Sequence, residues 1–143
     1  MSNNGFNGTS ASDLVPQIVC NRVRTPDGTM LYSRHRHDYF CYIDDNGHEY
    51  SVDGGLDYLK RSYSDRAAPV VEMSVYSTDP HEVIREAFAW GSRGIKGDQP
   101  VMYLTLNVMA PEHIEAILDT QRHITPAIRK VFEDELKYRE QNG

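Results

Sequence analysis

The sequence predicts an α+β fold, with an antiparallel β-sheet in the N-terminal half packed with three helices. The first half holds β-branched and aromatic runs separated by turn residues. From residue 79 onward, apolar side chains recur instead at helical spacing. The chain has 143 residues, of which 39% are hydrophobic and 25% are charged. That size and composition are typical of one globular domain with a single core.

The β half is expected to contain five strands joined by tight turns. The expected strands cover residues 17–24, 30–37, 39–44, 48–53 and 70–76. The sequence Thr-Pro-Asp-Gly at residues 25–28 indicates a tight turn. Asp-Asp-Asn-Gly at residues 44–47 predicts a hairpin with a type I′ turn, because Asn-Gly accepts positive φ. The polar segment 62–69 is expected to be a loop.

Three helices and one further strand are expected after residue 79. Asp79 and Pro80 favour a helix start, and Gly91 is placed to end that helix. Residues 100–106 indicate a strand. Helices then begin at Pro111 and at Thr125–Pro126. Their apolar faces would be Ile114, Ile117 and Leu118 in one helix, and Ile128, Val131, Phe132 and Leu136 in the other. Because only residues 122–125 separate these helices, an αα corner is predicted at the C-terminus.

The length, the composition and the net charge of the chain predict one domain and exclude some classes of partner. Residues 1–16, rich in Asn, Gly and Ser, are expected to form a flexible leader, and residues 17–143 a single domain. The leader lacks the features of a signal peptide, and no apolar run reaches the roughly 20 residues that a membrane span needs. A cytoplasmic protein without a membrane partner is therefore expected. The net charge of −6 makes a nucleic-acid polymer an unexpected partner. The two cysteines form no CxxC pair.

A histidine-rich segment offers the only pattern for metal binding or acid–base catalysis. His-x-His on a strand would place both rings on one face, as a metal site requires. However, no second ligand pair follows at a fixed spacing, so cross-strand polar packing is favoured and no metal or cofactor is expected. Catalysis by a small hydrolase stays open as an alternative. The residues concerned are His35, His37 and Asp38, with Cys20, Cys41 and His48 nearby in the predicted sheet.

Two glycine-containing segments are candidates for binding an anion. Gly54 and Gly55 precede Arg61, which predicts either a bulged turn with a solvated basic end or an arginine that reaches an anionic ligand. Trp90 precedes a glycine-rich loop that carries Arg93, so its ring could stack on a base while the loop binds phosphate. The loop is not a Walker motif. For Phe88, a core position is favoured over a ligand contact.

The αα corner supplies two more candidate ligand contacts. Arg129 lies in the first turn of the last helix, where a cation is misplaced unless an anion or an acidic neighbour compensates it. Arg122 is less informative, because a cation at a helix C-terminus complements the dipole. The acidic run 133–135 is expected on the solvated outer face of the last helix. Since no Ser/His/Asp or Cys/His arrangement stands out, binding is favoured over catalysis.

The chain resembles a family of small phage-encoded proteins over residues 19–139. One matching segment is His37-Asp38 followed by Val-Asp-Gly-Gly-Leu-Asp-Tyr-Leu at residues 52–59. The other runs from Phe88-x-Trp90-Gly91 through residues 113–124 to 129–139. The resemblance extends to the phage anti-Thoeris sponges, which sequester cyclic ADP-ribose-type and cyclic oligonucleotide signals. It implies a β-sheet half with C-terminal helices, assembled into a homo-oligomer with pockets between subunits in the host cytoplasm.

The resemblance implies a non-catalytic protein that holds a cyclic nucleotide-type signal without degrading it. Ligand contacts would then fall on Arg61, Phe88 and Arg129. Glu115 stands where a basic residue is expected on the second helix, which argues against that one contact. Residues 25–28 replace a cysteine pair seen in relatives, which argues against a metal-ribbon role. A phage protein that inhibits a host protein by direct binding is the main alternative. The complete set of predicted ligand contacts is Arg61, Phe88, Trp90, Arg93, Arg122 and Arg129.

Overall fold

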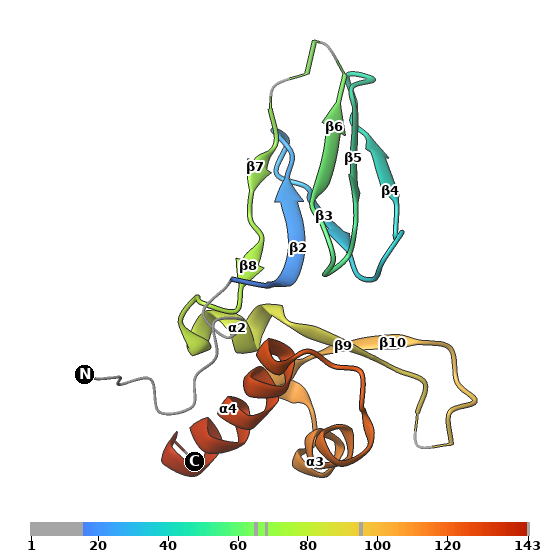
Figure 1. The fold of residues 1–143 in the computed structure, drawn as a ribbon. Helices are drawn as coiled ribbons and strands as arrows, with labels where there is room; N and C mark the ends of the chain where they lie inside the picture. The colour runs from blue at the N-terminus through green and yellow to red at the C-terminus, as the bar shows by residue number, and fades with distance from the viewer. Residues whose placement is uncertain (1–15, 65, 68, 95, 143) are drawn as a thin grey trace. The chain divides into compact units, whose positions relative to one another are not determined.

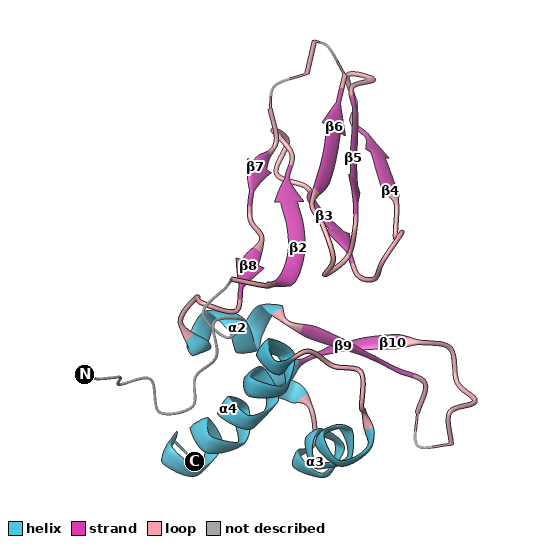
Figure 2. Cartoon of the chain, viewed as in Figure 1, coloured by secondary structure: helices cyan, strands magenta, loops and turns pink. Residues whose placement is uncertain are grey.

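The computed structural model describes residues 16–142 except 65, 68 and 95, and these residues fall into two compact units. The β unit is Ile18–Tyr76, and the helical unit contains the described residues 77–142 together with 16 and 17. Antiparallel strands and C-terminal helices confirm the predicted α+β class (Figure 2). The expected leader lies outside the described residues up to residue 15, and a single domain over 17–143 stays a prediction.

Two antiparallel sheets build the β unit (Figure 1). In the first, the strand order is β3-β2-β7, and β8 also pairs with β2. The second has the order β4-β5-β6. Val23 and Leu31 of the first sheet form one buried cluster with Tyr50 and Val52 of the second. The bounds are β2 Ile18–Arg24, β3 Met30–Ser33, β4 Phe40–Ile43, β5 Glu49–Asp53, β6 Lys60–Tyr63, β7 Val71–Glu72 and β8 Val75–Tyr76.

The predicted turns form, but their details differ from expectation. The hairpin at residues 44–47 closes through a 2.9 Å bond from Gly47 N–H to the Asp44 carbonyl. Gly47 has positive φ and Asn46 does not, so the turn is not type I′. The predicted strand 70–76 breaks at Ser74, whose Oγ accepts a 3.1 Å bond from Arg22 N–H. The first two residues of the expected loop 62–69 are instead the end of strand β6, because they pair with Ser51 and Tyr50 of β5.

The Gly54–Gly55 pair is a structural turn fixed by a buried asparagine. Asn21 Nδ2 donates to the carbonyl of Gly55 at 2.9 Å and also lies within reach of two neighbouring carbonyls. Gly55 N–H donates to Ser33 Oγ at 2.9 Å. Both glycines have positive φ. A Cβ on Gly55 would lie 2.2 Å from the His35 carbonyl carbon, so the backbones approach too closely for any side chain.

The helical unit consists of a β-hairpin and helices (Figure 1). Its buried core is mostly aliphatic and includes Phe88 and Phe132. The first helix was expected to reach Gly91, but it ends at Ala87. Trp90 and Gly91 instead form a strand that pairs with Leu104 and Tyr103. The described residues contain no helix that is both long and apolar enough to span a bilayer. The bounds are α2 His81–Ala87, β9 Ala89–Ser92, β10 Met102–Thr105, 3₁₀ helix η1 Leu106–Val108, α3 Pro111–Thr120 and α4 Pro126–Asn142.

We predict that Gly55→Ala destabilises the β unit far more than Gly47→Ala. Both positions need positive φ, but a Cβ at Gly47 meets nothing within 4 Å. Gly47→Ala should therefore lower the unfolding free energy by only about 1–2 kcal/mol, the cost of the left-handed backbone. Gly55→Ala adds a backbone clash and should cost more than about 3 kcal/mol. Urea denaturation followed by circular dichroism measures both, and equal losses would contradict the proposed close approach.

Candidate functional site

Of the aromatic residues predicted to contact a ligand, Phe88 lies in the core of the helical unit and Trp90 packs against that core. Phe88 has no exposed surface, and its ring lies 5.5 Å from that of Phe132. Trp90 is partly buried and packs edge-on against Phe132 at 5.3 Å. A ligand could reach Phe88 only if this core opened. The favoured core position of Phe88 agrees with its burial, while a ligand contact by Trp90 stays a prediction.

The predicted arginines of the helical unit occupy different environments. Arg93, in the connection between β9 and β10, and Arg122, between α3 and α4, are exposed. Arg129 is half-buried and its Nη1 donates to the Leu118 carbonyl at 3.2 Å. That carbonyl belongs to the last turn of α3, where the helix dipole is negative. The cation at the start of α4 is therefore compensated by the end of α3, and its contact with a ligand stays a prediction.

Arg61, the remaining predicted contact, connects strands within the β unit. Its Nη2 donates to Glu72 Oε1 at 2.9 Å and to Ser74 Oγ at 2.8 Å. The side chain is 13% exposed, and its Nε and Nη1 are buried without an acceptor among the described residues. To grip a ligand, Arg61 would have to leave this position. The structure describes Arg61 in one unit and the other five predicted contacts in the other.

The histidine segment is not a strand, although the metal site and the alternative catalytic role considered for it both assumed that His35 and His37 lie on one strand. Strand β3 ends at Ser33, and His37 adopts a positive φ of 64° within a turn. His35 Nε2 lies 3.9 Å from Asp38 Oδ1, whereas His37 Nδ1 contacts the Tyr58 hydroxyl at 3.3 Å. The two histidines therefore have separate partners. Within the described part of the chain, no three His, Cys, Asp or Glu side chains gather as metal ligands would.

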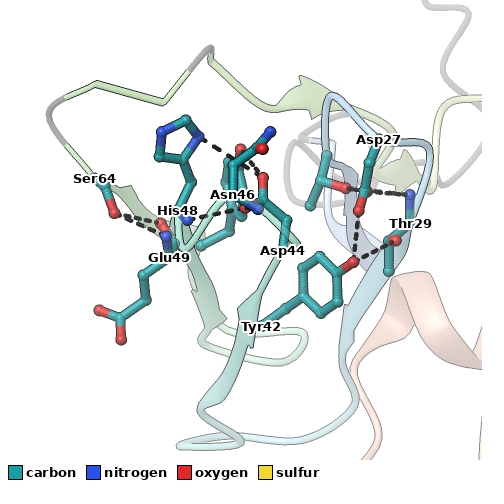
Figure 3. Close-up of polar contacts among 10 residues, drawn as sticks. Asp27, Thr29, Tyr42, Asp44, Asn46, His48, Glu49 and Ser64 are labelled. Atoms are coloured by element: carbon teal, nitrogen blue, oxygen red, sulfur yellow. Dashed lines mark hydrogen bonds and ion pairs between the residues drawn. The ribbon is translucent and has the colours of Figure 1, made fainter.

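Two aspartates at the hairpin turns of the β unit are engaged in local hydrogen bonds (Figure 3). Asp27 accepts from the hydroxyl of Thr25 and, at 2.5 Å, from that of Tyr42. These bonds, with that of Thr25 the strongest, hold the pKa of Asp27 well below its usual value. Burial raises the pKa of Asp44, but bonds from the His48 backbone and the Tyr50 hydroxyl outweigh it and lower the pKa. Both carboxylates therefore stabilise turns.

The strongest concentration of charge in the helical unit surrounds Glu135. Its carboxylate is fully buried and accepts a bidentate pair of bonds from Arg85, Nε at 2.9 Å and Nη2 at 2.8 Å. Arg139 Nε bonds the same carboxylate at 2.7 Å, and His81 Nε2 lies 2.9 Å from it. Arg139 Nη2 also donates to the Leu106 carbonyl at 3.0 Å. These bonds connect α2, η1 and α4.

The prediction that residues 133–135 lie on a solvated face is wrong for Glu135. Glu135 comes three positions after Phe132 and four positions after Val131, so helical periodicity places all three on the buried face. Burial alone would raise the pKa of Glu135. The hydrogen bonds from Arg85, Arg139 and His81 more than offset that effect and lower the pKa to about 2. Glu135 is therefore a carboxylate held in its ionised form.

An open cavity of about 450 Å³ lies beside this cluster. Its lining residues are Arg85, Tyr138, Arg139 and Asn142. The Arg85 guanidinium lies over the Tyr138 ring at 4.4 Å, a cation–π contact that fixes its plane. The groups in direct contact, two guanidiniums and the single Glu135 carboxylate, carry a net positive charge, while Glu86 acts on Arg85 from farther away. The cavity therefore combines cationic forks, a ring and an amide.

Sequence reasoning missed this group because its members are far apart in the chain. Arg85 comes from α2, whereas Tyr138, Arg139 and Asn142 come from the end of α4. One local signal was present: Glu135 and Arg139 are four residues apart on one helix, a spacing that favours an ion pair. The partner on α2 could not be inferred without the packing of the two helices.

We predict that Glu135→Gln removes an acid-sensitive part of the stability. The folded pKa is about 2 and the usual value is 4.5, so the folded state binds fewer protons in this range. The contribution is fully present above pH 4.5 and is lost as the pH falls toward 2. The unfolding free energy of the variant should therefore not show this loss between pH 4.5 and 2. At neutral pH the variant should be about 3–5 kcal/mol less stable, since it leaves buried cations unpaired.

The matched control is Glu133→Gln, the same change at an exposed position of the same helix. It should alter the unfolding free energy by less than about 0.5 kcal/mol. Urea denaturation at a series of pH values from 2 to 7 measures both variants. If the two variants lost equal stability, the structural role assigned to Glu135 would be wrong.

Comparison with known proteins identified no relative of this chain. The chain matches no protein-family model, no curated protein and no solved structure. The candidate site is therefore defined by its own geometry: a positive, ring-containing cavity supported by a buried carboxylate.

Proposed function

We propose that the protein binds an anionic, ring-bearing small molecule of the cyclic-nucleotide class and holds it without degrading it. The cavity lined by Arg85, Tyr138, Arg139 and Asn142 is the observation that supports this proposal. Arginine suits phosphate because its planar fork can donate two parallel hydrogen bonds. Within the described residues, Arg85 bonds Glu135 through Nε and Nη2, while Arg139 bonds Glu135 through Nε and the Leu106 carbonyl through Nη2. A guanidinium has five N–H donors, so donors remain for a ligand.

The Glu135 carboxylate holds the two guanidiniums in place before a ligand arrives. Their ordering is therefore not a cost of binding, which favours affinity. The cavity lies at the C-terminal end of α4, whose dipole is negative. Attraction of an anion must therefore come from the arginines, not from the helix. Asn142 is an exposed residue of the lining at this end of α4. A negative charge added there would oppose the binding of an anion further.

Capture is favoured over hydrolysis by the chemistry of the lining. The lining side chains are two cations, a phenol and an amide. The carboxylate that the lining arginines bond, Glu135, is buried and engaged by Arg85, Arg139 and His81, so it is poorly placed to activate water. Retention of a signal at micromolar concentration needs about −10 kcal/mol of binding free energy or better. Four lining residues cover one side of a ligand, so the proposal includes a homo-oligomer that covers the other.

The biological role that we propose is that of the phage anti-defence proteins which this sequence resembles. The protein would hold a host immune signal, such as a cyclic ADP-ribose isomer or a cyclic oligonucleotide, in the host cytoplasm. The resemblance of residues 19–139 supports this role, and the positive cavity is compatible with it.

We predict that Asn142→Asp weakens the binding of such ligands about tenfold or more. A new negative charge roughly 6 Å from a phosphate costs on the order of 1.4 kcal/mol at an intermediate dielectric constant. Asn46→Asp, which makes the same charge change at an exposed turn of the β unit, is the matched control and should leave affinity unchanged. Calorimetric titration with cyclic ADP-ribose and a cyclic dinucleotide measures both. Equal effects of the two variants would exclude this cavity as the site.

A companion experiment compares this cavity with the contacts predicted from the sequence. After binding, the protein is heat-denatured and the released ligand is analysed by mass spectrometry. Intact ligand supports capture, and a changed product supports a hydrolase. Arg129→Ala should leave retention intact if the Arg85–Arg139 cavity is the site, because Arg129 is engaged with the end of α3. Loss of retention in a folded Arg129→Ala protein would favour the sequence-predicted set instead.

A further inference from the structure

The helical unit contains a second, separately lined cavity that the proposed anion site does not use. It has a volume of about 580 Å³, within the range of small-molecule sites. The end of β9 and the loop after it contribute Ser92 and Gly94. The residue before α3 and the first half of α3 contribute the other side. The residues from that side are Ala110, Glu112, His113 and Ala116.

Small residues make the walls of this cavity, which we call the slot. Among the described residues that line it, Gly94, Ala110 and Ala116 are small, and most of its surface is apolar. Three polar side chains lie around these walls: the Ser92 hydroxyl, the Glu112 carboxylate and the His113 ring. Apolar walls with a few convergent polar groups are the common composition of a small-molecule site. The slot therefore suits a planar, hydrogen-bonding ring.

The polar groups of the slot have unused hydrogen-bonding capacity. Glu112 and His113 make no side-chain hydrogen bond or ion pair within the described residues. Ser92 Oγ accepts a 3.2 Å bond from Gly94 N–H, so its own proton can be donated to a ligand. The slot thus offers an acceptor-only carboxylate and at least one hydroxyl donor.

We propose that the slot binds a guanine-type base. Guanine presents two adjacent N–H donors on its Watson–Crick edge, which a carboxylate can accept together, and its O6 and N7 accept from a hydroxyl or an imidazole N–H. Adenine offers only one donor group next to a ring acceptor. Uracil flanks its single N–H with two carbonyls, which a carboxylate repels. The inference deepens the proposed function, on which it rests for the nucleotide class of the ligand, by naming the base. Among the ligands proposed above it favours a guanine-containing cyclic oligonucleotide over a cyclic ADP-ribose isomer, whose base is adenine.

Uncharged nucleosides test the slot independently of the anion site. We expect guanosine to shift the backbone amide signals of Gly94 and Ala116 in a saturable manner in ¹H–¹⁵N NMR titrations. Inosine, which lacks the 2-amino group, should bind at least several-fold more weakly, and adenosine and uridine weaker still. Equal shifts by all four nucleosides, or no shifts at these two amides, would overturn the proposal.

Two variants on α3 provide a matched comparison. Glu112→Gln replaces half of the acceptor pair by a donor and should weaken guanosine binding about tenfold, or about 1.4 kcal/mol. Glu115→Gln makes the same change three residues later, outside the slot, and should have no effect. Ala116→Leu fills the slot while keeping a good helix former, so it should abolish the shifts without unfolding α3. Unchanged guanosine binding in Glu112→Gln or in folded Ala116→Leu contradicts the assignment.

The anion-site variant Asn142→Asp separates the failure of this inference from the failure of the proposed function. It should leave guanosine binding unchanged, because the nucleoside carries no phosphate and Asn142 does not line the slot. A slot that binds guanosine in a protein that retains no cyclic nucleotide would disprove capture and keep the slot. Retention of a cyclic nucleotide without guanosine-induced NMR shifts would support capture and disprove the slot.

Discussion

The helical unit depends on one buried carboxylate. Glu135 has no exposed surface, and an uncompensated charge in that position would cost several kcal/mol. Arg85, Arg139 and His81 compensate it from α2 and α4, and Arg139 also bonds the Leu106 carbonyl of η1. The requirement to satisfy Glu135 therefore determines how these elements pack. The same requirement brings two guanidiniums together at a cavity, so the stability of the unit and its positive site have one physical cause.

The β unit uses its polar side chains differently. The Asn21 side chain donates to a backbone carbonyl of the Gly54–Gly55 turn. Asp27 and Asp44 accept hydrogen bonds within their hairpins. Arg61 connects β6 to Glu72 and Ser74. These groups bond within the fold itself, although Nε and Nη1 of Arg61 have no acceptor among the described residues. In the helical unit, by contrast, Glu112 and the remaining guanidinium donors are available for a ligand. This difference is the reason that both of our functional proposals lie in the helical unit.

The two cavities would supply different parts of the recognition of a nucleotide. Guanidiniums that face a phosphate provide attraction, but phosphate is common to all nucleotides. A carboxylate that accepts from a base edge discriminates between bases, because the wrong base leaves polar groups unpaired. A protein that must hold one signal among many cellular nucleotides needs both properties. The anion site would provide affinity, and the slot would provide selectivity for the base.

The sequence by itself determined the features that arise from neighbouring residues. The α+β class, the hairpin turns at residues 25–28 and 44–47, and the helix starts at Pro111 and Pro126 follow from local backbone preferences and periodicity. Tertiary structure alone decided the rest. Polar β6 is a strand because β5 lies beside it, and Trp90 extends in β9 because β10 pairs with it. Arg129 is compensated by a carbonyl of α3, and Glu135 is buried because Arg85 approaches from α2. Each of these outcomes depends on a partner distant in the chain, and no local pattern encodes which distant groups will meet.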